Sequence, residues 1–381
     1  MSSIYLDHNA TTPPLPEVVE TVARISREAF ANPGSRHAGG RVARRVLDEA
    51  REIIGQVLDA APSEIVFTSG GTEANNLALF GFARGRSGTF AAMEGEHPSI
   101  EEPLKELEAR GWRRCTIPMS PEGLPAVAAE MLSPPDGPSA TIGFATMMLA
   151  HNETGVIREV GPWGTECLGG RIPFHVDAVQ AAGKVDVDFR ASGATTMSIA
   201  AHKFGGPRGI GVLLVRTGSR LPAMAFGGHQ ESGMRPGTEV TSLAAGMAKS
   251  LELWQLDRDD RTRRLGALRD RFEAGVLAAV PGSFVHAAGA PRLPNTSNIA
   301  FPGCDGDALL VALDLAGVCA SLGSACASGS SEPAPILLAM GCSESVARSS
   351  LRFSVGWTNT AEEIDDSVRR IAQVVARLTG L

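Results

Sequence analysis

The stretch from Met197 to Gly206, with the sequence MSIAAHKFGG, places a lysine directly after an apolar run and directly before a pair of glycines. The run at its start is typical of a buried strand. Burial of Lys203 would cost its ammonium group hydration, lower its pKa and make the neutral amine available as a nucleophile. A lysine that extends its amine into solvent is the ordinary alternative. The surrounding residues have to decide between these two interpretations.

Seven short apolar runs alternate with helix-like segments along the 381 residues of the chain. These runs begin at Ile65, Thr89, Arg114, Thr141, Ile172, Met197 and Gly211. The alternation predicts an α/β fold with a mostly parallel, seven-stranded sheet that is covered by helices. A chain of this length exceeds one ordinary core. We therefore expect a large domain over residues 13–255 and a smaller α+β domain that contains residues 1–12 and 256–381.

The composition is that of a globular protein, with 20 % charged residues and a formal net charge of −7. The negative charge argues against non-specific binding to nucleic acids or to an anionic membrane. No apolar run approaches the roughly 20 residues that are needed to span a bilayer, and no secretory signal is visible. The six cysteines form no C-x-x-C pair. We therefore expect a cytoplasmic protein with free thiols and without a metal site.

Polar side chains follow several of the predicted strands at the point where each strand ends. They are His97, Asn152, Asp177, Gln180, His202 and Lys203. Each of them alone has an ordinary explanation as a cap or turn residue. Because the carboxyl ends of parallel strands meet at one edge of a sheet, we expect these side chains to form one site.

A glycine turn over residues 69–72 joins the Ile65 run to a helix-like segment that begins at Glu73. Such a turn directs free backbone N–H groups and a helix N-terminus toward one place, which suits a phosphate group, and Thr72 can add a hydroxyl donor. Close packing is the more common explanation of a lone glycine pair.

Two of these residues match the needs of pyridoxal phosphate, which requires a lysine for a Schiff base and a carboxylate beside its pyridine nitrogen. Asp177 and Lys203 lie 26 positions apart, a suitable length for one crossover between parallel strands. His97 can lie over the ring face, and Gln180 and Asn152 can donate hydrogen bonds to the phenolate oxygen.

Cys326 lies in a loop of small residues, SLGSACASGSSEP, from Ser321 to Pro333. These surroundings are typical of a mobile nucleophile, although an incidental surface cysteine is the ordinary alternative. Arg352 lies in an apolar strand-like run, where a buried guanidinium needs an anion. That anion is either a substrate carboxylate or an internal aspartate or glutamate.

A series of motifs runs in order over nearly the whole chain. They include YLDHNATT (5–12), NPGS (32–35), FTSGGTE (67–73), NETG (152–155), VDAVQ (176–180), HK (202–203), RPGT (235–238), GSAC (323–326) and LR (351–352). With these motifs the chain resembles the cysteine desulfurases, which are pyridoxal phosphate enzymes of aminotransferase fold type I in the class-V aminotransferase family. It is most similar to the bacterial branch that serves iron–sulfur cluster assembly and nitrogenase maturation.

The resemblance implies a homodimer that converts L-cysteine to L-alanine and places the sulfur on Cys326 as a persulfide. Lys203 would bind the cofactor as a Schiff base. His97 would stack on the ring and move protons. Asp177 would pair with the pyridine nitrogen, and Gln180 with the phenolate oxygen.

The resemblance also implies a phosphate site formed by Gly71, Thr72 and His202, with Thr238 reaching over from the second subunit. The family usually carries a serine two residues before the histidine, whereas this chain has Ala200. Loss of a hydrogen bond to a charged group costs about 1.5–3 kcal/mol if nothing replaces it. We therefore expect weaker cofactor binding than is usual in the family.

For the substrate, the resemblance implies that Asn152 and Arg352 bind the carboxylate of L-cysteine. The persulfide would pass to an acceptor protein in iron–sulfur assembly, in transfer RNA thiolation, in DNA sulfur modification or in another specialised pathway. A selenocysteine lyase or a small-amino-acid aminotransferase of the same fold is one alternative function. A relative that has lost catalysis and serves as a scaffold is another. We expect neither a membrane nor a nucleic acid as a direct partner.

The segment 160–170 occupies the place where relatives have an amphipathic helix. Pro162 and four glycines disfavour a helix there. The sequence therefore predicts a short or irregular crossover.

Overall fold

The computed structural model describes residues 3–132, 142–219, 221–323 and 333–380. At its centre is a seven-stranded sheet with the strand order β2-β8-β7-β6-β5-β3-β4. The strands are β2 (Ile65–Thr68), β3 (Thr89–Met93), β4 (Arg113–Ile117), β5 (Ile142–Met148), β6 (Phe174–Asp177), β7 (Thr196–Ala200) and β8 (Gly211–Val215). In this sheet β8 runs in one direction and the other six strands run in the opposite direction. The predicted α/β fold with a mostly parallel sheet is confirmed.

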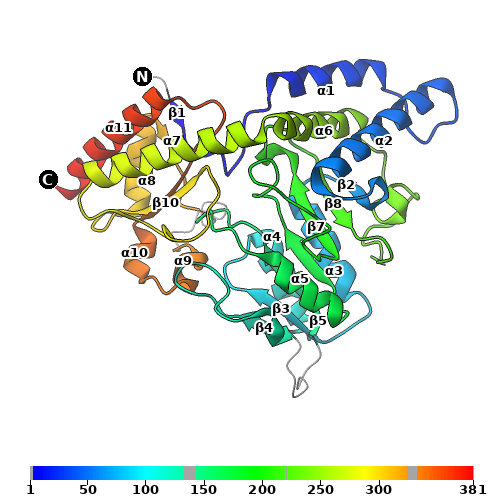
Figure 1. Ribbon diagram of the computed structural model, residues 1–381, viewed down its shortest axis with the longest axis horizontal. Helices are drawn as coiled ribbons and strands as arrows, with labels where there is room; N and C mark the ends of the chain where they lie inside the picture. Colours follow the sequence, from blue (N-terminus) through cyan, green and yellow to red (C-terminus); the bar gives the residue numbers. More distant parts are fainter. Residues whose placement is uncertain (1–2, 133–141, 220, 324–332, 381) are drawn as a thin grey trace.

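Helices cover both faces of the sheet (Figure 1). They are α1 (Pro16–Glu28), α2 (Ala38–Leu58), α3 (Gly71–Ala83), α4 (Pro98–Ala109), α5 (Val160–Gly169) and α6 (Thr241–Leu256). α2, α5 and α6 share one core with strand residues such as Phe67 and Ile199. α3 and α4 pack on the opposite face, against strand residues such as Phe90 and Leu213. Because the strands are buried on both faces, they appear in the sequence as continuous apolar runs.

A second hydrophobic core lies at the end of the molecule where both termini meet (Figure 1). Its sheets pair β1 (Ile4–Tyr5) with β11 (Val318–Cys319), and β10 (Thr296–Ala300) with β9 (Phe284–Val285) and β12 (Ser350–Ser354). The helices of this part are α7 (Arg258–Ala279), α8 (Gly306–Leu315), α9 (Pro335–Ala339), α10 (Glu344–Arg348) and α11 (Ala361–Thr379). Ile4 and Leu6 pack with Phe353 and Ile371, so the first residues of the described chain share a core with the last helix.

The segment 160–170 forms a continuous helix, α5, so the prediction of an irregular crossover was wrong. Pro162 is the third residue of the helix, where its missing N–H would have no intrahelical acceptor. A β-carbon at Gly164 would overlap the carbonyl oxygen of Ser192. Trp163 and Cys167 are buried in the main core. Packing thus requires glycine at position 164, although the intrinsic helix propensity of glycine is low.

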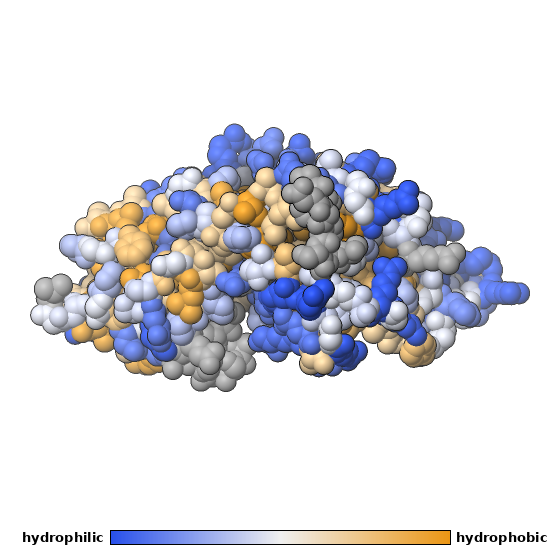
Figure 2. Space-filling view, turned by 90° about the horizontal axis from the view of Figure 1, so that it is seen from below, coloured by the Kyte–Doolittle hydropathy of each residue, from blue (hydrophilic) through white to orange (hydrophobic). Residues whose placement is uncertain are grey.

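None of the helices in the described part of the chain is long and apolar enough to cross a lipid bilayer. On the face seen in Figure 2, apolar residues gather mainly over the side of the molecule that carries α9 and α10, and the opposite side is largely polar. Elsewhere, α8 exposes Val311 and Leu315.

Candidate active site

A cavity of about 200 Å³ opens beyond the carboxyl ends of the central strands. Its wall is formed by Gly71, Thr72, His97, Ser99, Met148, Asn152, Asp177, Val179, Gln180, Ala200, His202 and Lys203. Eight of the eleven predicted site residues are therefore neighbours. They meet because β2, β3, β5, β6 and β7 all point toward the same edge of the sheet.

Lys203 ends η3 (Ala201–Lys203), a single 3-10 turn that directly follows β7. Its Nζ donates hydrogen bonds to the carbonyl oxygens of Asn9 (2.7 Å) and Ala10 (2.9 Å). Burial and the nearby Arg352 guanidinium lower the pKa of Lys203 to about 8. An amine with this pKa is partly neutral near neutral pH and can act as a nucleophile. The amine of Lys203 is thus held by two carbonyl oxygens and does not extend into solvent.

Asp177 is the last residue of β6 and is buried. Its Oδ2 accepts a hydrogen bond from Asn75 Nδ2 (2.8 Å), and its Oδ1 accepts one from the backbone N–H of Val179 (2.9 Å). These two bonds hold the carboxylate in one orientation at the cavity wall. A buried carboxylate of this kind suits a cationic ring nitrogen as its partner.

His97 caps the N-terminus of α4 and also faces the cavity. Its Nδ1 accepts a hydrogen bond from the Ser99 N–H (3.1 Å) and lies 2.7 Å from Ser99 Oγ. Burial lowers the pKa of His97, so the ring is neutral at neutral pH and carries its proton on Nε2. Asn75 Nδ2 donates to Ser99 Oγ (2.8 Å) as well as to Asp177. A chain of hydrogen bonds thus connects Asp177 to His97.

The N-terminus of α3 supplies the anion-binding end of the cavity. Gly71 and Thr72 are the first two helical residues, and the first N–H groups of a helix have no intrahelical acceptor. Ala200 lies beside them, because a β-carbon added to Gly71 would stand 3.7 Å from Ala200 Cβ. His202 lies on the same wall, and burial lowers its pKa to about 4. It therefore offers an anion a hydrogen bond rather than a positive charge.

Arg352 and Thr238 are the two described residues of the predicted site that do not line the cavity. Arg352 is buried nearby, where Nη1 donates to the Asn152 carbonyl oxygen (3.3 Å) and Nη2 pairs with Asp7 (2.6 Å). The internal ion pair is thus present, yet Arg352 Nε has no hydrogen-bond partner among the described residues. Thr238 is exposed between η4 (Glu231–Gly233) and α6. Cys326 lies outside the described residues.

Four buried polar residues that hold the cavity wall were missed by the sequence analysis: Asn9, Asn75, Ser99 and Lys184. Two of them leave a signal in the sequence. Asn75 lies three residues after Thr72, about one helical turn away. Lys184 is one of only four lysines among the 35 basic residues of the chain.

The chain matches known proteins over nearly its whole length. Residues 4–366 match the family model for class-V aminotransferases. The chain is 38 % identical to the IscS-like cysteine desulfurase of Mycobacterium tuberculosis, over 98 % of this chain and 96 % of that protein. It is 36 % identical to the cysteine desulfurase NifS of Azotobacter vinelandii, over 100 % and 94 %. The solved structure of a NifS-like protein superposes with a TM-score of 0.88 at 29 % identity and covers 99 % of this chain and 100 % of that chain. The chain therefore belongs to the class-V aminotransferase family.

Proposed function

We propose that this protein is a cysteine desulfurase that uses pyridoxal phosphate to convert L-cysteine to L-alanine and a protein-bound persulfide. The observation that carries the proposal is that one cavity is lined both by Lys203, whose amine has a lowered pKa, and by the buried carboxylate of Asp177. Full-length relatives that are named cysteine desulfurases support it.

The donor set of the cavity fits pyridoxal phosphate. Lys203 would bind its aldehyde carbon, Asp177 would pair with the pyridine nitrogen, and Gln180 would donate to the phenolate oxygen. The free N–H groups at Gly71 and Thr72 would hold the phosphate. When bound, the cofactor supplies an electron sink for the reacting carbon of the amino acid.

The remaining roles fall to residues around the cavity. His97, held through Nδ1, carries its proton on Nε2 and would give that proton and take it back there. Asn152 and the Nε of Arg352, which has no hydrogen-bond partner in the described part of the chain, would bind the substrate carboxylate. The Cys326 thiolate would attack the substrate sulfur. A sulfur–sulfur bond would form as the carbon–sulfur bond breaks, the electron pair would stay with carbon, and protonation would give alanine.

We also propose a homodimer, in which Thr238 completes the phosphate site of the second subunit. Thr238 is exposed in the single chain, and Phe226 and Val240, from the surrounding segment, expose 80 % and 49 % of their surface. Exposed apolar residues of this kind are typical of an interface. The persulfide would then pass to an acceptor protein for iron–sulfur cluster or thio-cofactor synthesis, as in the branch that the chain resembles.

Substitution of the nucleophile tests the reaction. In the holoenzyme, Cys326→Ala should abolish sulfide release from L-cysteine in the presence of dithiothreitol and should keep the visible absorbance of the bound cofactor. Cys342→Ala, which removes a different thiol that is partly buried, is the control and should keep full sulfide release. Unchanged sulfide release by Cys326→Ala would contradict the role of Cys326 as the nucleophile. A wild type that releases no sulfide, with a transamination activity that survives Cys326→Ala, would favour an aminotransferase. Absence of visible absorbance in the wild type after addition of pyridoxal phosphate would favour a scaffold protein.

A further inference from the structure

Lys184 and Asn9 form a buried polar network directly behind the cavity wall. Their exposed fractions are 4 % and 1 %. Lys184 Nζ donates to Gln180 Oε1 (2.7 Å) and to Asn9 Oδ1 (3.0 Å). The carbonyl oxygen of Asn9 accepts from Gln180 Nε2 (3.0 Å) and from Lys203 Nζ (2.7 Å). Two cavity residues, Gln180 and Lys203, therefore share one acceptor.

The side chain of Asn9 makes all four hydrogen bonds that an amide can make. Its Oδ1 accepts from Lys184 and from Asn295 Nδ2 (3.0 Å). Its Nδ2 donates to the Asn152 carbonyl oxygen (3.0 Å) and to Thr296 Oγ1 (2.8 Å). This pattern leaves one orientation for the amide, and it anchors the backbone carbonyl that receives Lys203.

The amide of Gln180 is also held in one orientation. Because the Asn9 carbonyl oxygen can only accept, the NH₂ group of Gln180 must face it, and the amide oxygen then faces Lys184 Nζ. Gln180 lines the cavity, and its NH₂ group has a second N–H beside the one that it donates to Asn9, so a donor is available to a ligand. If the amide turned over, it would offer a lone pair instead.

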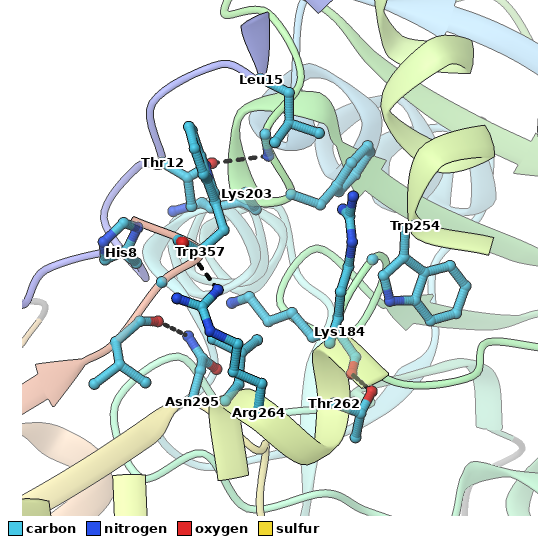
Figure 3. A pocket seen from close by; sticks show the side chains of 17 residues that line it. His8, Thr12, Leu15, Lys184, Lys203, Trp254, Thr262, Arg264, Asn295 and Trp357 are labelled. Carbon is cyan, nitrogen blue, oxygen red and sulfur yellow. Dashed lines mark hydrogen bonds between the residues drawn. The ribbon is translucent and has the colours of Figure 1, made fainter. Parts of the chain in front are cut away.

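Lys184 has the chemistry that this position requires. Figure 3 shows its side chain extending toward Asn295 across a second cavity, which Lys203 also lines. Burial, together with nearby Lys203 and Arg352, lowers the pKa of Lys184 well below its usual value. The amine can donate these two hydrogen bonds in either protonation state, and the lowered pKa favours the state that adds no second cation beside Lys203.

Arginine could not do the same, because its guanidinium group keeps its charge. The chain uses arginine for nearly all of its other cations, since only four of its 35 basic residues are lysines. Lys105 and Lys249 form helix-surface ion pairs with Glu102 and Glu252. The other two lysines, Lys184 and Lys203, are the ones that contact Asn9.

We propose that Lys184 is a positioning residue that acts through Gln180: it occupies the amide oxygen and thereby turns the amide NH₂ toward the cavity. This inference rests on the proposed function, in which Gln180 donates to the phenolate oxygen of pyridoxal phosphate. Without Lys184 only the Asn9 carbonyl still favours this orientation, and an amide that turns over would present an oxygen that repels the phenolate.

A double-mutant cycle on the dissociation constant of pyridoxal phosphate tests this role. The constant is measured by absorbance for the wild type, Lys184→Met, Gln180→Ala and the double variant. Each single substitution should raise it about tenfold, the usual loss for a hydrogen bond to a charged group. The double variant should bind no more weakly than Gln180→Ala, because Lys184 acts through Gln180. Lys249→Met, the same substitution on a helix surface, should leave the constant unchanged.

Additive losses would overturn the inference, because they would mean that Lys184 acts independently of Gln180. An unchanged constant in Lys184→Met would overturn it as well. Lys184→Gln keeps a donor and should recover part of the loss, and the cycle is run with this variant if Lys184→Met does not fold. A wild type that binds no pyridoxal phosphate would instead overturn the proposed function, and this inference with it.

Discussion

The hydrogen-bond networks around Asn75 and Asn9 hold different parts of the site by different means. The partners of Asn75 are Ser99, His175 and Asp177, all from the main sheet or the helices that cover it. The partners of Asn9 include Lys184 as well as Asn295 and Thr296, which lie beside and at the start of β10. The sheet alone can therefore place the carboxylate and the imidazole. The amine and the amide NH₂ come into place only when the N-terminal segment is packed between the two cores.

The largest expected effect follows from removal of the Asn9 side chain, which joins residues from both cores. Asn9→Ala would remove one hydrogen-bond partner from each of three buried residues, Lys184, Asn295 and Thr296. We expect the free energy of unfolding to fall by about 3 kcal/mol. Cofactor affinity should fall as well, because the carbonyl that holds Lys203 loses its anchor. Urea denaturation measures the first effect and cofactor titration the second. The control is Asn76→Ala, an asparagine that is only half-buried, with a change below about 0.5 kcal/mol.

Asn75→Ala should have a somewhat smaller effect, a loss of about 2 kcal/mol in the free energy of unfolding, because Asp177 keeps its bond from Val179. The two networks share no partner in the contacts described above. The losses of Asn9→Ala and Asn75→Ala should therefore add within about 0.5 kcal/mol in the double variant. A strongly non-additive result would show that the networks form one unit.

The pH dependence of the free energy of unfolding should report on Lys203 rather than on the network around Asn75. In the cofactor-free protein the pKa of Lys203 is about 8, whereas it is 10.5 in the unfolded chain. Between these values the unfolded state binds more protons, so the free energy of unfolding rises with pH. From about pH 7.5 to about pH 9.5 the wild type should gain about 1–2 kcal/mol relative to Lys203→Met. A difference that is constant with pH would mean that Lys203 has an ordinary pKa.

Ala200→Ser adds a hydroxyl on the sheet side of the site, beside the N-terminus of α3. We expect the dissociation constant of pyridoxal phosphate to fall about tenfold through the new hydrogen bond to the phosphate. The stability of the cofactor-free protein should change little. An equal affinity in both proteins would show that the phosphate already has its full set of partners.

The sequence predicts well those features that depend on local pattern and on the direction of strands. Asp177, His97 and Lys203 each follow an apolar run, and the parallel sheet brings them to one cavity. The sequence misses features that depend on distant contacts. Lys184 contacts a residue 175 positions away, and no local pattern marks that pair. The error at α5 has the same cause, because the packing of Gly164 against Ser192 outweighs the low helix propensity of glycine.

The central claim is that, of the two buried lysines beside Asn9, Lys203 binds the cofactor and Lys184 does not. Borohydride reduction of the holoenzyme followed by peptide mass spectrometry tests this claim directly, because the chain has only four lysines to distinguish. We expect the pyridoxyl group on the peptide that contains Lys203, and on no other lysine. A label on Lys184, or none on Lys203 in a protein that has the visible absorbance of the bound cofactor, would contradict the account.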